Sequence, residues 1–404
     1  MNVITTQADL RRLCRLALKA QGLLQVGPFG RGINGAHKAI GHLGYVQLDS
    51  ISVIERAHHH VLQARVPGFQ PGMAERLLIR GDIFEYWSHA AAFLPMADFR
   101  FSLPYKHAIK SGQTHWFKDP DQQLMQDLLT RIRMDGPLRA RDVETQRSGN
   151  SGWWDWKPAK KALEQLYMQG DLMVSDRTGF QKTYDLTERV LPAGTDTSPP
   201  SAAELAAHLL DQQLRCHGLV SGKGLTYLRR VPGLKEAMKD LLDERLAAGE
   251  LASVQLHNGA VFHLSAGALD GPAPRTSHRL RILSPFDNAV IQRDRLNSLF
   301  GFDYQIECYV PATKRRYGYF SLPLLYRDHF VGRMDAKAHR KTGVLEVRQL
   351  HLEDHPFDTD ALIDALVKAL DEFRVFQGCA RVVVKSVEPD EIKQLLQLSL
   401  NDIH

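Results

Sequence analysis

In the triplet Gln47-Leu48-Asp49, an aliphatic residue separates two residues whose side chains can take part in catalysis. In the stretch 44–51 polar and apolar residues alternate, which is typical of a strand with one buried face. Side chains two apart on a strand point the same way, so Gln47 and Asp49 would project side by side while Leu48 faces the core. A carboxylate beside an amide can hold and activate one water molecule. The alternative is that Asp49 belongs to a turn or cap and Gln47 is a solvated strand residue.

The composition is that of an ordinary soluble globular protein. The 404 residues are enough for roughly two to four domains, and 44% of them are apolar and 24% charged. The net charge of +5 permits an anionic partner without requiring one. No stretch is long and apolar enough to span a membrane, and the N-terminus lacks the order of a signal peptide, so we expect a cytoplasmic protein. The cysteines are too far apart for a zinc ribbon, an iron–sulfur cluster or a disulfide framework; they are Cys14, Cys216, Cys308 and Cys379.

The triplet must be positioned by the elements around it, and the sequence predicts helices before it and after it. Apolar residues recur at helical spacing in three stretches, and an aromatic-rich, strand-like stretch follows them. In order these stretches are 5–23, with Thr5 or Thr6 as the N-cap, then 34–43, 71–80 and 83–95. Three helices followed by a hairpin are the order of a winged helix. We therefore expect a winged-helix domain over residues 1–118 that carries the triplet.

The same order of elements recurs twice further along the chain. In each of two segments, apolar residues at helical spacing are followed by two apolar runs on either side of a turn. This pattern predicts a second winged helix over 119–192 and a third over 193–272. In the third, Asn258-Gly259 is typical of a hairpin turn. Residues 273–404 change to several β-like runs and then a helix, which predicts a small antiparallel β-sheet or barrel with a C-terminal α/β segment. The runs are 304–310, 316–325, 329–333 and 344–350, and the segment after them predicts a helix over 358–377 and a strand over 381–385. The expected fold class is α+β.

Two blocks of the sequence resemble the YcaQ/AlkZ-like family of DNA glycosylases. In that family a Q-Φ-D or Q-Φ-Q triplet, with Φ aliphatic, carries catalysis, and Gln47-Leu48-Asp49 has the Q-Φ-D form of the YcaQ branch. The second block contains Leu283-Ser284-Pro285-Phe286-Asp287-Asn288, Tyr309-Val310-Pro311 and Val331-Gly332-Arg333-Met334-Asp335-Ala336-Lys337. The resemblance covers most of residues 5–390. It implies tandem winged-helix domains arranged around the β-sheet, in one C-shaped monomer on double-stranded DNA.

The resemblance further implies hydrolysis of the N-glycosidic bond of N7-alkylated guanine, including bulky adducts and interstrand crosslinks, which leaves abasic sites for base excision repair. An N7-alkylated base is cationic and leaves easily, so a carboxylate that stabilises the sugar cation and activates water is sufficient. We assign this role to Asp49 and the orientation of the water to Gln47. A base tethered to both strands cannot swing into a deep pocket, so we expect no enclosed nucleobase pocket around Asp49. With no lysine nucleophile near the triplet, we expect a monofunctional enzyme without a cofactor.

Candidate DNA contacts gather where basic residues alternate with aromatic ones. Residues 310–348 hold nine lysines or arginines against three acids, a mixture that suits phosphates, sugars and bases. A similar mixture, which includes Lys106, occurs over 99–118, and the lysines of the helix predicted over 158–169 are placed for a groove. A solvated basic surface is the alternative in each case. The DNA-binding candidates are Lys314, Arg315, Arg316, Arg333, Lys337, Lys157, Lys160 and Lys161. Tyr86 and His89 are candidates for lining the site, with core packing as their alternative.

Other functional classes explain less of the sequence. The run His58-His59-His60 does not predict a metal site, because three consecutive residues of a regular element cannot all face one ion. A nuclease would need clustered acids to hold metal ions, and we find no such cluster in the sequence. A non-catalytic winged-helix DNA-binding protein, such as a transcriptional regulator, explains the fold and the basic patches. It gives no reason for Gln47 and Asp49 to share a face that points at DNA.

Overall fold

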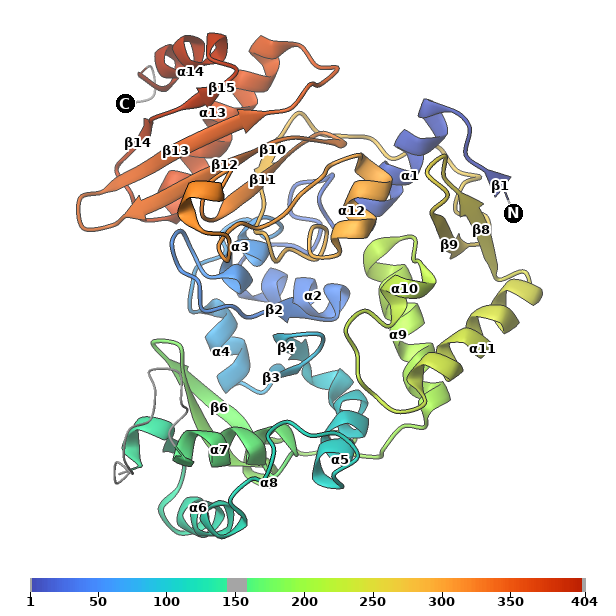
Figure 1. Ribbon diagram of the computed structural model, residues 1–404, viewed down its shortest axis with the longest axis vertical. Coiled ribbons are helices and arrows are strands. Elements are labelled where there is room, and N and C mark those ends of the chain that lie inside the picture. Colours follow the sequence, from blue (N-terminus) through green and yellow to red (C-terminus); the bar gives the residue numbers. More distant parts are fainter. Residues whose placement is uncertain (1, 144–157, 402–404) are drawn as a thin grey trace. The chain divides into compact units, whose positions relative to one another are not determined.

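The chain folds into two compact units, each built from segments that are apart in sequence. The computed structural model describes residues 2–143 and 158–401. The first unit comprises Met1–Gln70, Gln212–Leu225 and Glu244–His404, and the second comprises Pro71–Asp211 and Thr226–Asp243. Both units mix helices and strands, which confirms the α+β class (Figure 1). The finer division into three winged helices and a barrel domain stays a prediction.

The main core of the first unit lies between a curled sheet and a long helix. β11 (Ser321–Tyr326), β12 (His329–His339) and β13 (Val344–Leu352) are successive antiparallel strands, and β10 (Leu280–Ile282) pairs with β11. The sheet forms a half-barrel. α13 (Thr359–Phe376) packs its apolar side on the leucines and valines of these strands (Figure 1). Burial of these aliphatic side chains is the main force that holds the unit together.

The sheet is mixed, because the C-terminal segment, which the sequence did not place in it, adds two strands to the antiparallel ones. α13 carries the chain back across the sheet, so β14 (Arg381–Val384) and β15 (Val387–Glu388) both run parallel to β13, as a helical crossover requires. The predictions of a helix over 358–377 and a strand over 381–385 are confirmed within two residues. The strand predicted over 304–310 is wrong, because this stretch forms no ladder.

The elements next to the triplet come from the first 70 residues. α1 (Gln7–Ala20) begins after Thr6, whose side chain accepts a hydrogen bond from the Asp9 backbone N–H, as predicted. α2 (Gly32–Leu43) ends at Gly44, which has φ +77° and no room for a side chain because Gln212 occupies that place. β2 (Val46–Gln47) follows directly. α3 (Ala57–Gln63), which contains the buried histidine run, was not predicted.

Smaller elements complete the first unit. The N-terminal strand adds in parallel to the predicted third hairpin, which makes a three-stranded sheet. These elements are β1 (Asn2–Val3), α10 (Gly222–Leu225), β8 (Leu251–Gln255), β9 (Val261–Ser265), α12 (Arg293–Phe300), η3 (Ala312–Lys314) and α14 (Glu391–Asn401).

The second unit consists of hairpins packed on helices. The hairpin of β3 (Ile83–Trp87) and β4 (Ala91–Pro95) and that of β6 (Leu172–Thr178) and β7 (Gln181–Leu186) both lie where the sequence predicted them. β5 pairs with β7. The remaining elements are α4 (Met73–Ile79), η1 (Met96–Ser102), α5 (Leu103–Lys110), α6 (Gln122–Asp135), β5 (Leu138–Arg139), η2 (Ala140–Asp142), α7 (Pro158–Met168) and α8 (Thr187–Val190). Two of the boundaries between the units fall within helices, α9 (Ala202–His217) and α11 (Leu234–Ala247).

A buried ion pair joins three parts of the first unit. Two nitrogens of Arg65 donate to the two carboxylate oxygens of Asp287 at 2.7 and 2.8 Å, and both side chains are fully buried. The same guanidinium donates to the backbone carbonyl of Gln21, at the end of α1, and to that of Val61 in α3. Next to Asp287, the amide of Asn288 donates to the backbone carbonyl of Tyr45 at 3.1 Å. The ion pair and Asn288 thus connect α1, α3 and the stretch that leads into the triplet.

Asp287→Asn tests this connection. The substitution leaves the Arg65 guanidinium buried without its counter-charge and with one acceptor oxygen fewer, so we expect a loss of about 3–5 kcal/mol in the free energy of unfolding. Asp294→Asn is the matched control, because Asp294 pairs with Lys223 at the surface and should change stability by less than about 1 kcal/mol. Urea denaturation followed by circular dichroism gives both values. Equal stability of the two variants would contradict a structural role for the pair.

Candidate active site

The triplet lies where β2 ends. Val46 is fully buried and Gln47 is 6% exposed, so both side chains of the strand are held by packing. The strand predicted over 45–51 is wrong beyond Gln47, because the Asp49 side chain ends the extended conformation. Its Oδ1 accepts a hydrogen bond from the Ile51 backbone N–H at 2.8 Å, which is an Asx turn. The turn anticipated as the alternative to catalysis is therefore present, and it fixes the carboxylate in one orientation.

Asp49 is half-buried and has one oxygen available for a further partner. Burial raises the pKa of its carboxyl group above the usual value, and the Ile51 N–H opposes that shift. Among the described residues, no hydrogen bond to its second oxygen, Oδ2, is present. A carboxylate with a raised pKa is a stronger base than an exposed one, and its free oxygen can accept a proton from water.

Tyr309, one of the aromatic residues of the basic block that suit sugars and bases, lies near Asp49, which the sequence did not predict. Burial is the main cause that raises the pKa values of the Cys308 thiol and the Tyr309 phenol, and the negative charge of Asp49 is a further cause. Both groups therefore lie close enough to Asp49 to be affected by its charge. Tyr309 is 83% exposed, which is unusual for so large an aromatic side chain. The sequence placed it on an expected strand. The sequence feature that could have indicated a loop here is the position of Tyr309 just before Val310-Pro311, at the edge of the basic block.

The loop that carries Tyr309 is held by one carboxylate. The two oxygens of Glu307 accept hydrogen bonds from the backbone N–H groups of Arg316 and Tyr317 at 3.0 and 2.7 Å. The Glu307 side chain thus satisfies two backbone donors that a neighbouring strand would otherwise pair with. The Arg315 side chain donates to the Val310 carbonyl at 2.8 Å and closes the loop from inside.

The basic cluster Lys314-Arg315-Arg316 belongs to this same loop. Lys314 and Arg316 are exposed, and Arg315 is half-buried. The Arg315 and Arg316 guanidiniums lie 5.0 and 4.8 Å from the ring centroids of Tyr319 and Tyr317, a cation–π geometry that orients them. The loop therefore presents positive charge and an exposed aromatic ring in the neighbourhood of Asp49, a combination that suits the sugar–phosphate backbone of a nucleic acid.

Two basic residues that the sequence offered for DNA are buried in the structure. Arg333 is 3% exposed, bonds to Glu353 at 2.5 Å and lies 4.1 Å from the Tyr317 ring centroid, so packing and an ion pair occupy it. Lys106 is also 3% exposed, with its ammonium 4.0 Å from the Phe99 ring centroid, and burial lowers its pKa to about 7. Neither is placed for phosphate contact. Both belong to basic, aromatic stretches in which sequence alone cannot separate surface from core.

The remaining basic candidates differ in exposure. Lys160 and Lys161 are exposed on α7, and Lys337 is half-buried on β12. Lys157 lies outside the described residues. Their contact with DNA stays a prediction.

Tyr86 and His89 belong to the β3–β4 hairpin of the second unit. Tyr86 is 1% exposed and donates its hydroxyl to the Met168 carbonyl at 2.6 Å, which is the core role anticipated as the alternative. His89 is half-buried, and burial, with Arg229, lowers its pKa to about 4, so it is neutral at physiological pH. That either residue lines the site stays a prediction.

The histidine run has partners within the protein. His59 Nδ1 lies 3.1 Å from a carboxylate oxygen of Glu55, and His60 Nε2 lies 2.9 Å from the Ile282 carbonyl. We assign no metal to these residues, and a reaction without a cofactor stays a prediction. Among the described residues, no helix is long and apolar enough to cross a membrane.

Comparison with known proteins gives a family match and a structural match that bear on this site. Residues 40–375, which include the triplet and the Tyr309 loop, match the family described as AlkZ-like DNA glycosylase. The structure is similar to that of the DNA glycosylase AlkZ of Streptomyces sahachiroi, with a TM-score of 0.60 and 15% sequence identity, over 93% of this chain and 99% of that one. At that identity the structural match shows a shared fold. Since the family match covers most of the chain, this protein belongs to the AlkZ-like DNA glycosylase family.

Proposed function

We propose that this DNA glycosylase hydrolyses the N-glycosidic bond of N7-alkylated guanine in double-stranded DNA, with Asp49 as the catalytic carboxylate. The observation that carries the proposal is the half-buried carboxylate, fixed through one oxygen by the Ile51 N–H, in the neighbourhood of an exposed tyrosine on a basic loop. Burial favours a base of raised pKa, and the loop supplies the positive charge that DNA requires.

The reaction needs little help at the leaving base. The C1′–N9 bond breaks with its electron pair moving to the cationic base, which becomes neutral. Asp49 stabilises the positive charge that develops on the sugar, and a water oxygen bonds to C1′ while Asp49 accepts its proton. Gln47, held by the buried strand, orients that water.

A monofunctional reaction is consistent with the surroundings of Asp49. Burial and the Ile51 backbone N–H shift the pKa of Asp49, and no lysine of the described part of the chain is among the causes. A lyase step needs an amine nucleophile at the sugar carbon. We therefore propose hydrolysis alone, with an abasic site as product and no cofactor.

An open face suits bulky adducts and interstrand crosslinks. The described part of the chain contains two cavities of about 300 and 410 Å³, and neither is lined by Asp49 or Tyr309. A base joined to both strands cannot enter a deep pocket, so a half-buried carboxylate that lies outside these cavities can reach substrates that base flipping excludes. We propose that these lesions are substrates and that the Q-Φ-D triplet is of the YcaQ type.

The proposed architecture serves this task. We propose that the three helix-and-hairpin segments over 1–118, 119–192 and 193–272 are winged helices that contact the duplex, and that the protein works as a monomer in the cytoplasm. Lys160 and Lys161, exposed on a helix that precedes a hairpin, are placed for phosphate contact under this proposal.

Base release from defined duplexes tests the function. We expect the wild-type protein to release 7-methylguanine from a duplex with one such base, and to unhook a nitrogen-mustard crosslink, with free base measured by chromatography and abasic strand by alkaline cleavage. Borohydride should trap no protein–DNA adduct, because no amine attacks the sugar. If the protein binds every duplex and releases no N7 adduct, the proposed substrate class is wrong, and a DNA-binding role without catalysis on these lesions takes its place.

Tyr309 should act as a positioning residue whose ring packs on the sugar or base. Tyr309→Ala should lower kcat/KM for base release about tenfold, because stacking on a nucleotide contributes roughly 1–3 kcal/mol, whereas Tyr309→Phe should retain most activity. Met134→Ala, which removes another highly exposed side chain, is the control and should leave the rate unchanged. If Tyr309→Ala has wild-type kcat and KM, the ring does not contact substrate.

A further inference from the structure

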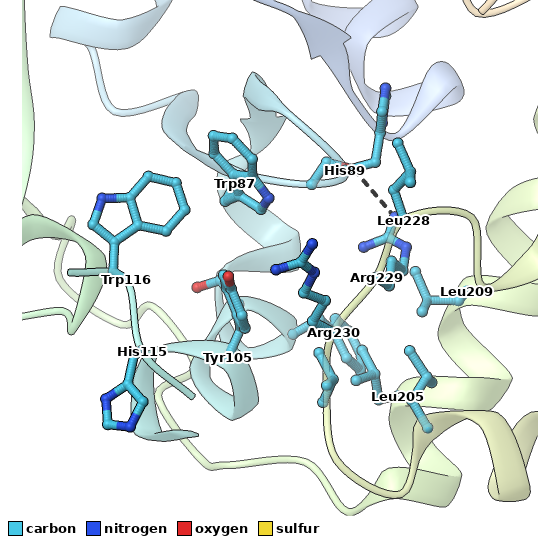
Figure 2. Close-up of a pocket in the computed structure, with 15 residues that line it drawn as sticks. Trp87, His89, Tyr105, His115, Trp116, Leu205, Leu209, Leu228, Arg229 and Arg230 are labelled. Carbon is cyan, nitrogen blue, oxygen red and sulfur yellow. Dashed lines mark hydrogen bonds between the residues drawn. The ribbon is translucent and has the colours of Figure 1, made fainter. Parts of the chain in front are cut away.

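A cavity of about 300 Å³ lies entirely within the second unit. Figure 2 shows the side chains of Trp87, Tyr105 and Arg230 around a common space, with Trp116 at its side. The two indole rings meet edge to face, with centroids 4.8 Å apart and planes at 72°. Rings held in this way can pack on a planar ligand without rearrangement. None of these residues takes part in the proposed glycosylase reaction.

The cavity walls carry hydrogen-bond donors and positive charge. Arg229 and Arg230 both line the cavity, and Arg229 donates to the Ser88 hydroxyl at 3.1 Å, the dashed line in Figure 2. Arg230 is exposed, and no ion pair to it is present among the described residues. The indole Nε1 of Trp116 is buried and has no acceptor within the described part of the chain. A buried donor without an acceptor is unfavourable, so this atom is suited to an acceptor on a ligand.

The rest of the wall is apolar. Leu205 and Leu209 project from α9, and Leu234 begins α11. Leu228 is 62% exposed and has φ +52°, a backbone conformation that a leucine rarely adopts. Strained residues of this kind cluster at binding sites, where the surrounding structure holds them in place. Among the described residues that line this cavity, none is an aspartate or a glutamate.

We propose that this cavity binds a nucleobase together with one adjacent phosphate. Indole, phenol and leucine surfaces suit the two faces of a heterocycle, the Trp116 N–H suits a ring nitrogen or carbonyl acceptor, and arginine suits the phosphate. A cationic ligand is disfavoured by the two arginines, and a purely apolar ligand would leave the Trp116 N–H without an acceptor. The ligand comes either from an unpaired nucleotide of DNA or from a free mononucleotide.

The experiment uses 2-aminopurine 2′-deoxyribonucleoside monophosphate, whose fluorescence changes when its ring stacks on an aromatic side chain. The full chain should bind this probe. Arg230→Gln should weaken binding about tenfold, because a charge-assisted hydrogen bond to the phosphate is lost, and Trp116→Phe should weaken it about threefold or more by removing the N–H donor. Arg131→Gln, which changes an exposed arginine on α6 of the same unit, is the matched control and should bind as the wild type does. Circular dichroism verifies the fold of each variant.

Competition against the bound probe identifies the source of the ligand. Displacement by a duplex with one bulged nucleotide, but not by the fully paired duplex, assigns the cavity to an unpaired nucleotide of DNA; displacement only by free deoxynucleotide assigns it to the mononucleotide. Displacement by inorganic phosphate at equal concentration would show an anion site without base recognition and overturn the proposal. Absence of probe binding, or equal binding by wild type and Arg230→Gln, would also overturn it. Asp49→Asn should bind the probe normally, so this result is independent of the glycosylase reaction.

Discussion

The contact between Arg65 and Asp287 is the constraint on which the candidate active site depends. Two charged groups are removed from water completely, and the two hydrogen bonds between them compensate for the loss of hydration only because their geometry is close to ideal. The remaining guanidinium protons go to Gln21 and Val61, so the donors of this charge are satisfied inside the protein. The net contribution of such a pair to the free energy of unfolding is modest, because the cost of desolvation offsets the attraction. The pair forms in only one arrangement of the segments that it joins, and it therefore fixes that arrangement.

That arrangement reaches Asp49 through a short series of bonds. Asn288, adjacent to Asp287, holds the Tyr45 carbonyl, and two residues later the chain leaves β2 and turns at Asp49. Gly44 brings the chain into this position through a left-handed conformation that leaves room for Gln212. A catalytic carboxylate must be held to within a fraction of an ångström. The proposed one, Asp49, is positioned by buried elements, whereas the basic cluster and the exposed Tyr309 belong to a loop.

Sequence patterns predicted the elements better than the surfaces. The caps, helical stripes and hairpin turns are local signals, so α1, the two hairpins of the second unit and α13 lie where the sequence placed them. The loop around Tyr309 was missed because Glu307 satisfies backbone donors nine and ten residues away, which no periodicity encodes. The burial of Arg333 and Lys106 was also missed, since a cation packed on aromatic rings in a core has the same composition as a nucleic-acid-binding surface. The triplet itself carried the candidate chemistry, but its turn became visible only with the Asp49–Ile51 bond.

The most direct test of the role of Asp49 is the pH dependence of single-turnover release of 7-methylguanine by the wild-type protein and by Asp49→Asn. The active form is the carboxylate, and burial raises its pKa, so the wild-type rate should increase with pH through a range above that of an ordinary aspartate. Asp49→Asn should bind the duplex with unchanged affinity, react at least about a hundredfold more slowly and lack that acid limb. A variant that keeps the wild-type rate and pH profile would contradict the assignment of Asp49 as the catalytic base.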